Sequence, residues 1–197
     1  MACSVCGFQH HCLCEQYPKF QHSIQVALLC HPNELNRATN TGKILLSALS
    51  TAEQFVWSRT EPPQELLTLI DEHPNPLLVF PSEHSQPITE CHHQRSAEQP
   101  LYIVLDATWQ EAKKMWRKSP WLQALPQCHL QPTGTSNYTL RRNQNEGNLC
   151  TCEVGTELMR TEGRHQQAQQ LDDFLHYYLQ VFQADRNGHA IKSNKIQ

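Results

Sequence analysis

Short apolar segments alternate with segments of helical periodicity along most of the chain. The strongest apolar segments are "SIQVALLCHP" at 23–32, "PLLVFPSEHS" at 76–85 and "LYIVL" at 101–105. Their length and their largely apolar character favour buried strands over helices. Weaker strand patterns occur at 53–57 and 127–132, whereas 82–99 is polar and rich in histidine and is predicted to be a loop.

Helical patterns lie between these strands. N-cap residue types at 39–41 precede Ile44, Leu45, Ala48 and Leu49, which repeat at helical spacing. Further helices are predicted at 62–73, from the end of the 101–105 strand to about 118, after 151, and at 166–186. The last helix carries one apolar stripe, formed by Leu171, Phe174, Leu175, Tyr178, Leu179 and Phe182.

Nearly all-apolar strands that alternate with helices predict an α/β fold with a mainly parallel sheet flanked by helices. We expect one main domain at 21–186, a cysteine-rich segment at 1–20 and a loose tail at 187–197. Neither a G-x-G-x-x-G turn after a strand nor a P-loop is present. A nucleotide-like ligand would therefore be bound without either of these standard phosphate-binding motifs.

Composition narrows the class of protein. The 197 residues carry a formal net charge of −3, so nucleic-acid binding would depend on a local basic patch. The polar N-terminus has no apolar signal-peptide core, and no apolar run approaches the length of a membrane helix. We therefore expect a cytoplasmic protein, with no membrane association and no evident obligate protein partner.

Four of the nine cysteines lie close together near the N-terminus: Cys3, Cys6, Cys12 and Cys14. The first pair has the C-x-x-C spacing of zinc knuckles, and Gly7 follows it at a position suited to a tight turn. The second pair, C-x-C, is closer than in most structural zinc sites, and His10 or His11 is an alternative ligand. We predict structural Zn²⁺ here, with free thiols or a redox dithiol as the alternatives.

Three segments combine buried elements with unusual polar residues: 31–42, 105–109 and 136–153. Two of them follow predicted strands, and the carboxyl ends of strands are where open α/β sheets bind ligands. Helix capping is the alternative for Asn40 and Thr41, and also for Asp106 and Thr108. If Thr108 is the N-cap residue, Glu111 completes a capping box with it.

Together with the cysteine cluster, the stretches "HPNELNRATNTG", "LDATW" and "SNYTLRRNQNEGNLCTCE" resemble the DTW-domain family, the tRNA-uridine aminocarboxypropyltransferases. The resemblance extends from Cys3 into the helix that begins near Glu153. The Asp-Thr-Trp of the family name is here interrupted by Ala107, a form that the family tolerates. The resemblance implies a SPOUT-like fold with a C-terminal trefoil knot that binds S-adenosylmethionine.

The activity implied by this resemblance is transfer of the 3-amino-3-carboxypropyl group of S-adenosylmethionine to N3 of a tRNA uridine, in the variable loop at position 47. Methylthioadenosine would be released. Asp106 is the only acid in "LDATW", and we assign it as the general base for the N3 proton. Trp109 would lie against the sulfonium or the uracil ring, with packing in the core as the alternative.

Further site residues are expected on the same basis. Arg141 or Arg142 is the candidate for binding the amino-acid carboxylate, because an Arg fork suits that group, and contact with RNA phosphate is the alternative for both. The other residues proposed to line the S-adenosylmethionine site are Asn40, Thr41, Gly42, Pro81, Ser82, Leu105, Thr108, Leu149 and Thr151. The residues proposed to contact RNA phosphate are Arg142 and the basic cluster Lys113, Lys114, Arg117 and Lys118, in which 113 and 117, and likewise 114 and 118, share a helix face. A solvated surface helix without RNA contacts is the alternative for this cluster.

Three other functions stay open from the sequence. One is a SPOUT-type RNA methyltransferase, which would release S-adenosylhomocysteine instead of methylthioadenosine. A second is an aminocarboxypropyltransferase that acts on ribosomal RNA. The third is a zinc-bearing RNA-binding module without catalysis. Cys150 and Cys152 are either packing residues or a second thiol pair beside the ligand.

Overall fold

The computed structural model describes residues 2–3, 6–93, 99–131 and 149–188. Within them, the chain forms a sheet in which every pair of neighbouring strands is parallel, in the order β2-β1-β5-β3-β6-β4. The strands are β1 (Gln25–Cys30), β2 (Ala52–Val56), β3 (Pro76–Val79), β4 (Gln86–Pro87), β5 (Leu101–Asp106) and β6 (Gln127–His129). The mainly parallel α/β sheet predicted from the sequence is confirmed.

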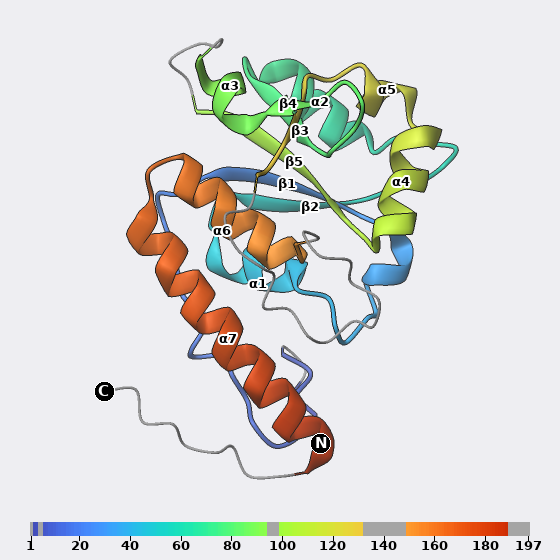
Figure 1. Cartoon of the computed structure of the whole chain (residues 1–197). Helices are drawn as coiled ribbons and strands as arrows, with labels where there is room; N and C mark the ends of the chain where they lie inside the picture. The colour runs from blue at the N-terminus through green and yellow to red at the C-terminus, as the bar shows by residue number, and fades with distance from the viewer. Residues whose placement is uncertain (1, 4–5, 94–98, 132–148, 189–197) are drawn as a thin grey trace.

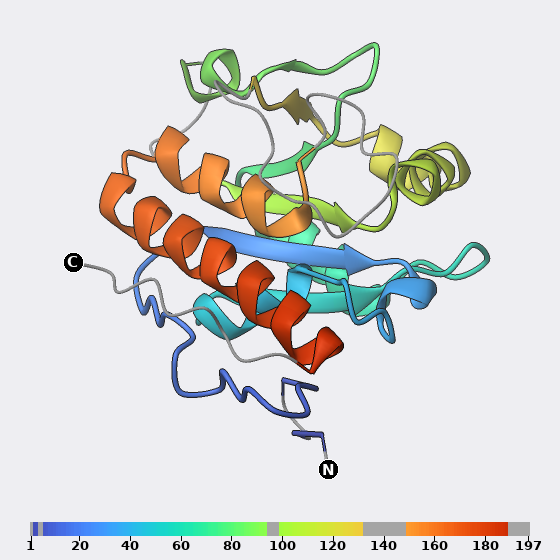
Figure 2. The same ribbon diagram turned by 60° about the horizontal axis from the view of Figure 1, so that its bottom comes forward.

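Helices cover both faces of this sheet, as Figure 1 shows. Those of the described chain are α1 (Gly42–Ala48), α2 (Gln64–Glu72), α3 (Ile88–His93), α4 (Trp109–Lys118), α5 (Pro120–Gln123), α6 (Thr151–Thr161) and α7 (His165–Asn187). A 3-10 turn, η1 (Pro32–Glu34), follows β1. α1, α6 and α7 lie on one face, and α2, α4 and α5 lie on the other. Figure 2 shows α6 and α7 running alongside each other.

Side chains that alternate along the strands divide the core into two halves. In β5 all six residues are buried; Tyr102 and Val104 face α6 and α7, whereas Ile103 and Leu105 face α2 and α4. β1 divides its residues between the same two cores. Because successive strand residues point to opposite faces, a strand covered on both sides is largely apolar, as β5 is up to Asp106 at its end.

Most predicted elements are confirmed, and one prediction is wrong. The polar segment 82–99 contains β4 and α3 and is not a continuous loop. Among the residues of this segment whose burial the structure describes, 82–91 and 99, Ile88 and Cys91 are buried in the core, too few to produce a clear helical pattern. α5 was also not predicted, because it has only four residues. In α7 the predicted stripe is buried except for Phe182, which is partly buried.

The N-terminal cysteine-rich segment packs into the larger of the two cores. Phe8, Leu13, Tyr17 and Phe20 are each at most 9% exposed and belong to the same core cluster as the buried residues of α7. The ring of Tyr17 lies 4.7 Å from that of Phe174. The predicted segment 1–20 therefore shares its core with the rest of the chain.

Two predictions about the C-terminal half fall outside the described residues. The expected knot depends on the chain path between β6 and α6, which includes residues 132–148. The expected tail includes residues 189–197. No helix in the described part of the chain is long and apolar enough to span a membrane.

The close contact between α1 and α6 gives a prediction about stability. Gly155 in α6 faces Leu45 in α1, and a Cβ atom at Gly155 would overlap the Leu45 side chain. Gly155→Ala should lower the free energy of unfolding by about 1–3 kcal/mol, because overpacking outweighs the better helix propensity of Ala. Chemical denaturation of both proteins measures this difference.

A double-mutant cycle with Leu45→Ala provides the control. Removing the Leu45 methyl groups makes room for the new Cβ, so Gly155→Ala should cost less in that background. Equal costs in the two backgrounds would contradict the proposed packing of Gly155 on Leu45.

Candidate functional site

The candidate site lies where the order of the parallel strands reverses. β1 and β5 are neighbours, and Cys30 pairs with Asp106 at their carboxyl ends. The chain leaves β1 through α1 toward β2 on one side, and leaves β5 through α4 toward β6 on the other. These connections diverge to opposite faces at the carboxyl edge, which is the usual place for ligand binding in open α/β sheets.

The carboxylate of Asp106 joins three segments at this edge. It is 1% exposed and accepts hydrogen bonds from Asn40 Nδ2 (2.8 Å), Thr151 Oγ1 (2.7 Å) and Cys30 Sγ (3.4 Å). Burial, and then the negative charge of Asp106, raise the pKa of the Cys30 thiol to about 12, so this thiol keeps its proton and donates. The loop before α1, the end of β5 and the start of α6 therefore meet at one buried acid.

The start of α1 is pressed against this carboxylate. A Cβ atom at Gly42 would lie 2.5 Å from Asp106 Oδ2, so only glycine fits there without a shift. The side-chain oxygen of Asn40 accepts from the backbone N–H of Gly42 (2.6 Å) and of Lys43 (3.3 Å). Asn40 thus caps α1 with its oxygen and contacts Asp106 with its nitrogen, so the capping prediction is confirmed for this residue.

The capping alternative is wrong for Thr41, whose hydroxyl contacts α6 and not α1. Its side chain makes no cap bond to α1; its hydroxyl oxygen accepts from the backbone N–H of Cys152 at the start of α6 (3.3 Å). Thr41 therefore ties the loop before α1 to α6, in parallel with the Asp106–Thr151 bond.

A capping box begins α4 next to Asp106. The Thr108 hydroxyl accepts from the N–H of Glu111, and the Glu111 carboxylate accepts from the N–H of Thr108. This capping prediction is confirmed, and because Thr108 is the N-cap residue, Asp106 does not cap α4. The Asp106 carboxylate instead contacts the loop before α1 and the start of α6.

Glu111 is also the centre of a second polar cluster that sequence reasoning missed. Arg37 donates to both of its carboxylate oxygens (2.8 and 2.9 Å), and Asn33 donates to one of them (2.8 Å). Arg37 also pairs with Glu34, whose side chain is fully buried, at 2.5 Å. The i, i+3 spacing of Glu34 and Arg37 in a loop after a strand was the available signal.

These contacts determine the ionisation of Glu111. Partial burial raises the pKa of its carboxyl, but the hydrogen bonds from Arg37, Thr108 and Asn33 lower it by more. The net result is a pKa well below the usual range for glutamate. Glu111 therefore stays ionised and links the loop after β1 to the start of α4.

Trp109 is exposed and not part of the core, so the core-packing alternative is wrong. Its side chain is 38% exposed, and its ring centroid lies 5.7 Å from that of Phe80, which follows β3. The ammonium of Lys113 lies 5.3 Å from the centre of the Trp109 ring. An aromatic surface and a positive charge thus stand together at the carboxyl edge.

The basic residues of α4 continue from this point along the helix surface. Lys113, Lys114, Arg117 and Lys118 are all exposed, whereas Ala112 and Met115 of the same helix are buried.

The remaining residues predicted to line the ligand site lie around the carboxyl edge of the sheet: Pro81 and Ser82 after β3, Leu105 in β5, and Leu149 before α6. Ser82 donates to Gln127 in β6 (2.6 Å). Arg141 and Arg142 lie outside the described residues.

Cys150 and Cys152 are packing residues. Both belong to the larger core cluster, at 9% and 0% exposure. Burial raises the pKa of Cys150 to about 12 and that of Cys152 well above its usual value. Because only a thiolate is a good nucleophile or metal ligand, their burial and raised pKa values favour a packing role over a second thiol pair.

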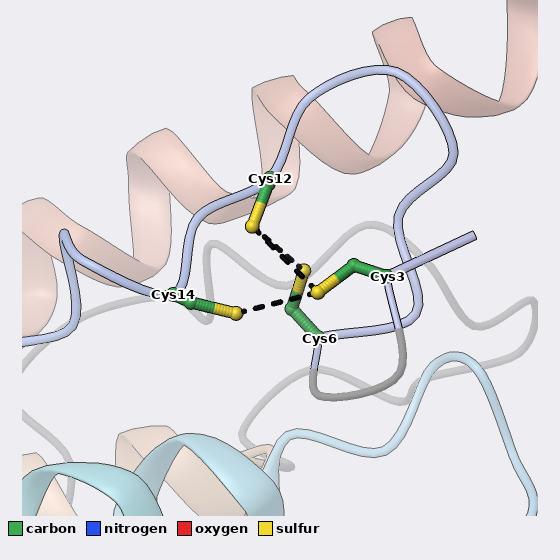
Figure 3. Close-up of side chains that lie close together, drawn as sticks. All are labelled: Cys3, Cys6, Cys12 and Cys14. Atoms are coloured by element: carbon green, nitrogen blue, oxygen red, sulfur yellow. Dashed lines mark hydrogen bonds between the residues drawn. The ribbon is translucent and has the colours of Figure 1, made fainter. Parts of the chain in front are cut away.

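The four N-terminal cysteines point toward one another, as Figure 3 shows. Their sulfur atoms all lie within 4.8 Å of one another, with Cys3–Cys14 at 3.6 Å, Cys3–Cys12 at 3.7 Å and Cys6–Cys12 at 3.8 Å. Four thiolates around a tetrahedral Zn²⁺ with bonds of about 2.3 Å are separated by about 3.8 Å. None of the four is in a disulfide, so the residues fit a closed zinc site.

Comparisons with known proteins identify the family of this chain. The family model described as "DTW domain" matches residues 1–183, and the chain therefore belongs to the DTW-domain family. It is 31% identical over 155 residues to the tRNA-uridine aminocarboxypropyltransferase 2 of Drosophila melanogaster, an alignment that covers 75% of this chain. The chain spans 61% of the length of that relative. No solved structure matches the chain.

The ionised Glu111 gives a pH-dependent prediction. Because its pKa is lower in the folded than in the unfolded protein, its contribution to stability is present above the unfolded value, about 4.3, and is lost as the pH falls toward the folded value. Glu111→Gln should lower the free energy of unfolding by about 1–3 kcal/mol at neutral pH. The difference from the wild type should shrink below about pH 4.

Denaturation curves from pH 3 to 8 measure this difference. Glu65→Gln, which changes an exposed glutamate in the first turn of α2, is the matched control and should have a small effect throughout. A Glu111→Gln effect that is constant over this pH range would rule out the ion pair as its cause.

Proposed function

We propose that this chain is an S-adenosylmethionine-dependent tRNA-uridine aminocarboxypropyltransferase. One observation carries the proposal: three polar segments distant in sequence converge on Asp106 at the strand-order reversal of a parallel sheet. Family membership and the name of the Drosophila relative supply the reaction class. The proposed acceptor is N3 of a uridine in the variable loop, and the proposed location is the cytoplasm, where tRNA is available.

The reaction has two requirements. The N3–H of uridine must lose its proton, and N3 must then attack the aminocarboxypropyl carbon that is bonded to the sulfonium sulfur. The carbon–sulfur bond breaks with its electron pair on sulfur, so the positive charge disappears and methylthioadenosine leaves. A base near N3 and a site that holds both reactants in line would meet these requirements.

The segments around Asp106 are proposed to hold S-adenosylmethionine. The residues concerned are Asn40, Thr41, Gly42, Leu105, Thr108, Leu149 and Thr151, with Pro81 and Ser82 on the neighbouring strand end. Several of them are already tied to one another by hydrogen bonds, which supports a preformed site. Arg141 is the proposed partner of the amino-acid carboxylate.

Asp106 is proposed to have two roles. Its burial and its three hydrogen-bond donors favour a role in holding the segments together. The base role proposed from the sequence requires the carboxylate to exchange one of these donors for the uridine N3–H. Trp109, exposed a few residues further on, is proposed to contact the sulfonium or the uracil ring.

The proposed RNA surface is the exposed basic face of α4, together with Arg142. Lys113 and Arg117 are one helical turn apart, and Lys113 also lies against Trp109. Contacts to phosphate from such a face are insensitive to sequence and sensitive to salt. The tRNA would thus be held next to the carboxyl edge of the sheet.

Structural Zn²⁺ is the proposed occupant of the site formed by Cys3, Cys6, Cys12 and Cys14. A closed site with four thiolates has no open coordination position, so the metal would stabilise the N-terminal segment and would not take part in the transfer. His10 and His11 are not needed as ligands, because four sulfur atoms already complete the tetrahedron.

Product analysis tests the proposed reaction. The purified protein is incubated with S-adenosylmethionine and unmodified tRNA, and nucleosides and small molecules are analysed by mass spectrometry. Aminocarboxypropyluridine together with methylthioadenosine is the expected result. A methylated nucleoside with S-adenosylhomocysteine would assign methyl transfer instead, and no product with any tRNA would overturn the proposal.

Asp106→Asn tests the role of the buried acid. Turnover should fall by at least about 100-fold, because both proton transfer and the geometry of the three segments are affected. The affinity for S-adenosylmethionine, measured by calorimetry, should fall as well, since an amide offers one acceptor oxygen in place of the two that receive Asn40, Cys30 and Thr151. Lost turnover with unchanged affinity for S-adenosylmethionine would assign Asp106 a role in proton transfer alone. Unchanged turnover would exclude both proposed roles of Asp106.

Removing charge from α4 tests the RNA surface. Lys113→Ala with Arg117→Ala should raise KM for tRNA. It should also make the salt dependence of binding less steep, by about one in the logarithmic slope for each phosphate that the variant no longer neutralises. The control is Lys19→Ala with Arg186→Ala, which removes two exposed charges elsewhere on the molecule. Equal effects of the two double variants would show that α4 has no special role in binding.

A further inference from the structure

The loop between the two cysteine pairs is held by a single carboxylate at the far end of the chain. The backbone N–H groups of Gln9, His10 and His11 all donate to Asp185 in α7, at 2.9, 2.6 and 3.1 Å. Asp185 lies 174 to 176 positions away in sequence, in the last turn of α7. Three consecutive amides directed at one acid fix the path of the loop between Gly7 and Cys12.

An aromatic contact anchors the same loop. Phe8 is 5% exposed, and its ring lies 5.3 Å from the ring of Tyr178 and 6.1 Å from that of Phe182, both in α7. The carbonyl of Phe8 accepts from the N–H of Cys3 (2.8 Å), so the docked residue is also bonded to a metal-ligand candidate. The loop is thus held on α7 by one buried ring and one acid.

The docked end of α7 also contacts the segment that leads into the candidate site. The ammonium of Lys43 lies 5.6 Å from the centre of the Tyr178 ring. Lys43 follows Gly42, whose backbone is pressed against Asp106. The end of α7 therefore touches both the cysteine segment and the start of α1.

We infer that Asp185 couples metal binding at the four-cysteine site to the docking of α7. The metal closes the Cys3–Cys14 loop into the shape whose amides fit Asp185, and Asp185 in turn holds the loop in the shape that brings the four sulfur atoms together. Groups that orient a ligand loop from outside the first coordination shell commonly change metal affinity by about 10–100-fold. Because coupling is reciprocal, zinc should stabilise the end of α7 as much as Asp185 stabilises zinc.

The inference rests on the zinc site proposed above and not on the transfer reaction. Its readouts are metal content and amide exchange, so an inactive protein that holds zinc would refute the proposed reaction and leave this inference standing. The full chain is used throughout, because residues of the N-terminal segment are buried in the common core.

The first measurement is the rate at which zinc passes from the purified protein to a colorimetric chelator. Asp185→Asn should release zinc at least about 10-fold faster than the wild type, since an amide accepts the three N–H groups more weakly than a carboxylate. Asp173→Asn, which changes an exposed acid on the same helix, is the control and should release zinc at the wild-type rate. Equal rates for the two variants, or a wild-type protein without stoichiometric zinc, would overturn the inference.

The second measurement needs no variant, which keeps the inference testable if Asp185→Asn does not fold. Hydrogen exchange of the wild type is compared before and after chelation of zinc. Exchange should become faster at 9–13 and in the last turns of α7, at 178–187, while the amides of β5 stay protected. Unchanged exchange in α7 after the metal is removed would refute the coupling.

Discussion

The buried carboxylate of Asp106 is the interaction on which the candidate site depends. A carboxyl group with 1% exposure is costly to bury unless donors surround it, and here Asn40, Thr151 and Cys30 provide them. These donors belong to three different segments, so satisfying one side chain fixes the relative positions of all three. The parallel sheet determines where the candidate site lies, because the connections after β1 and β5 diverge at its carboxyl edge.

Other contacts extend this organisation outward. The Glu111–Arg37 pair ties the loop after β1 to α4, whose surface presents Trp109 and the basic residues. On the opposite face of the sheet, α7 receives the cysteine segment through Phe8 and Asp185. The carboxyl edge of the sheet, a basic helix and the four-cysteine segment are thus arranged around one sheet in this member of the DTW-domain family.

The sequence predicted the sheet and most helices because each has a strong apolar pattern, as in β5 and α7. It also singled out Asn40, Asp106 and Thr151, since polar residues beside buried elements are unusual. It did not predict the partners, because Asp106–Thr151, Arg37–Glu111 and Asp185–His10 bonds join residues 45 to 175 positions apart. Such long-range pairs depend on the order of the strands, which no local pattern specifies. α3 and β4 were missed because few of their residues are buried.

Hydrogen exchange of the wild-type protein with and without S-adenosylmethionine tests the location of the site most directly. We expect slower exchange on binding in three places together, at 38–43, 105–109 and 149–153, because the ligand would contact the segments that Asp106 joins. Protection confined to other parts of the chain, or no protection at saturating ligand, would contradict this location.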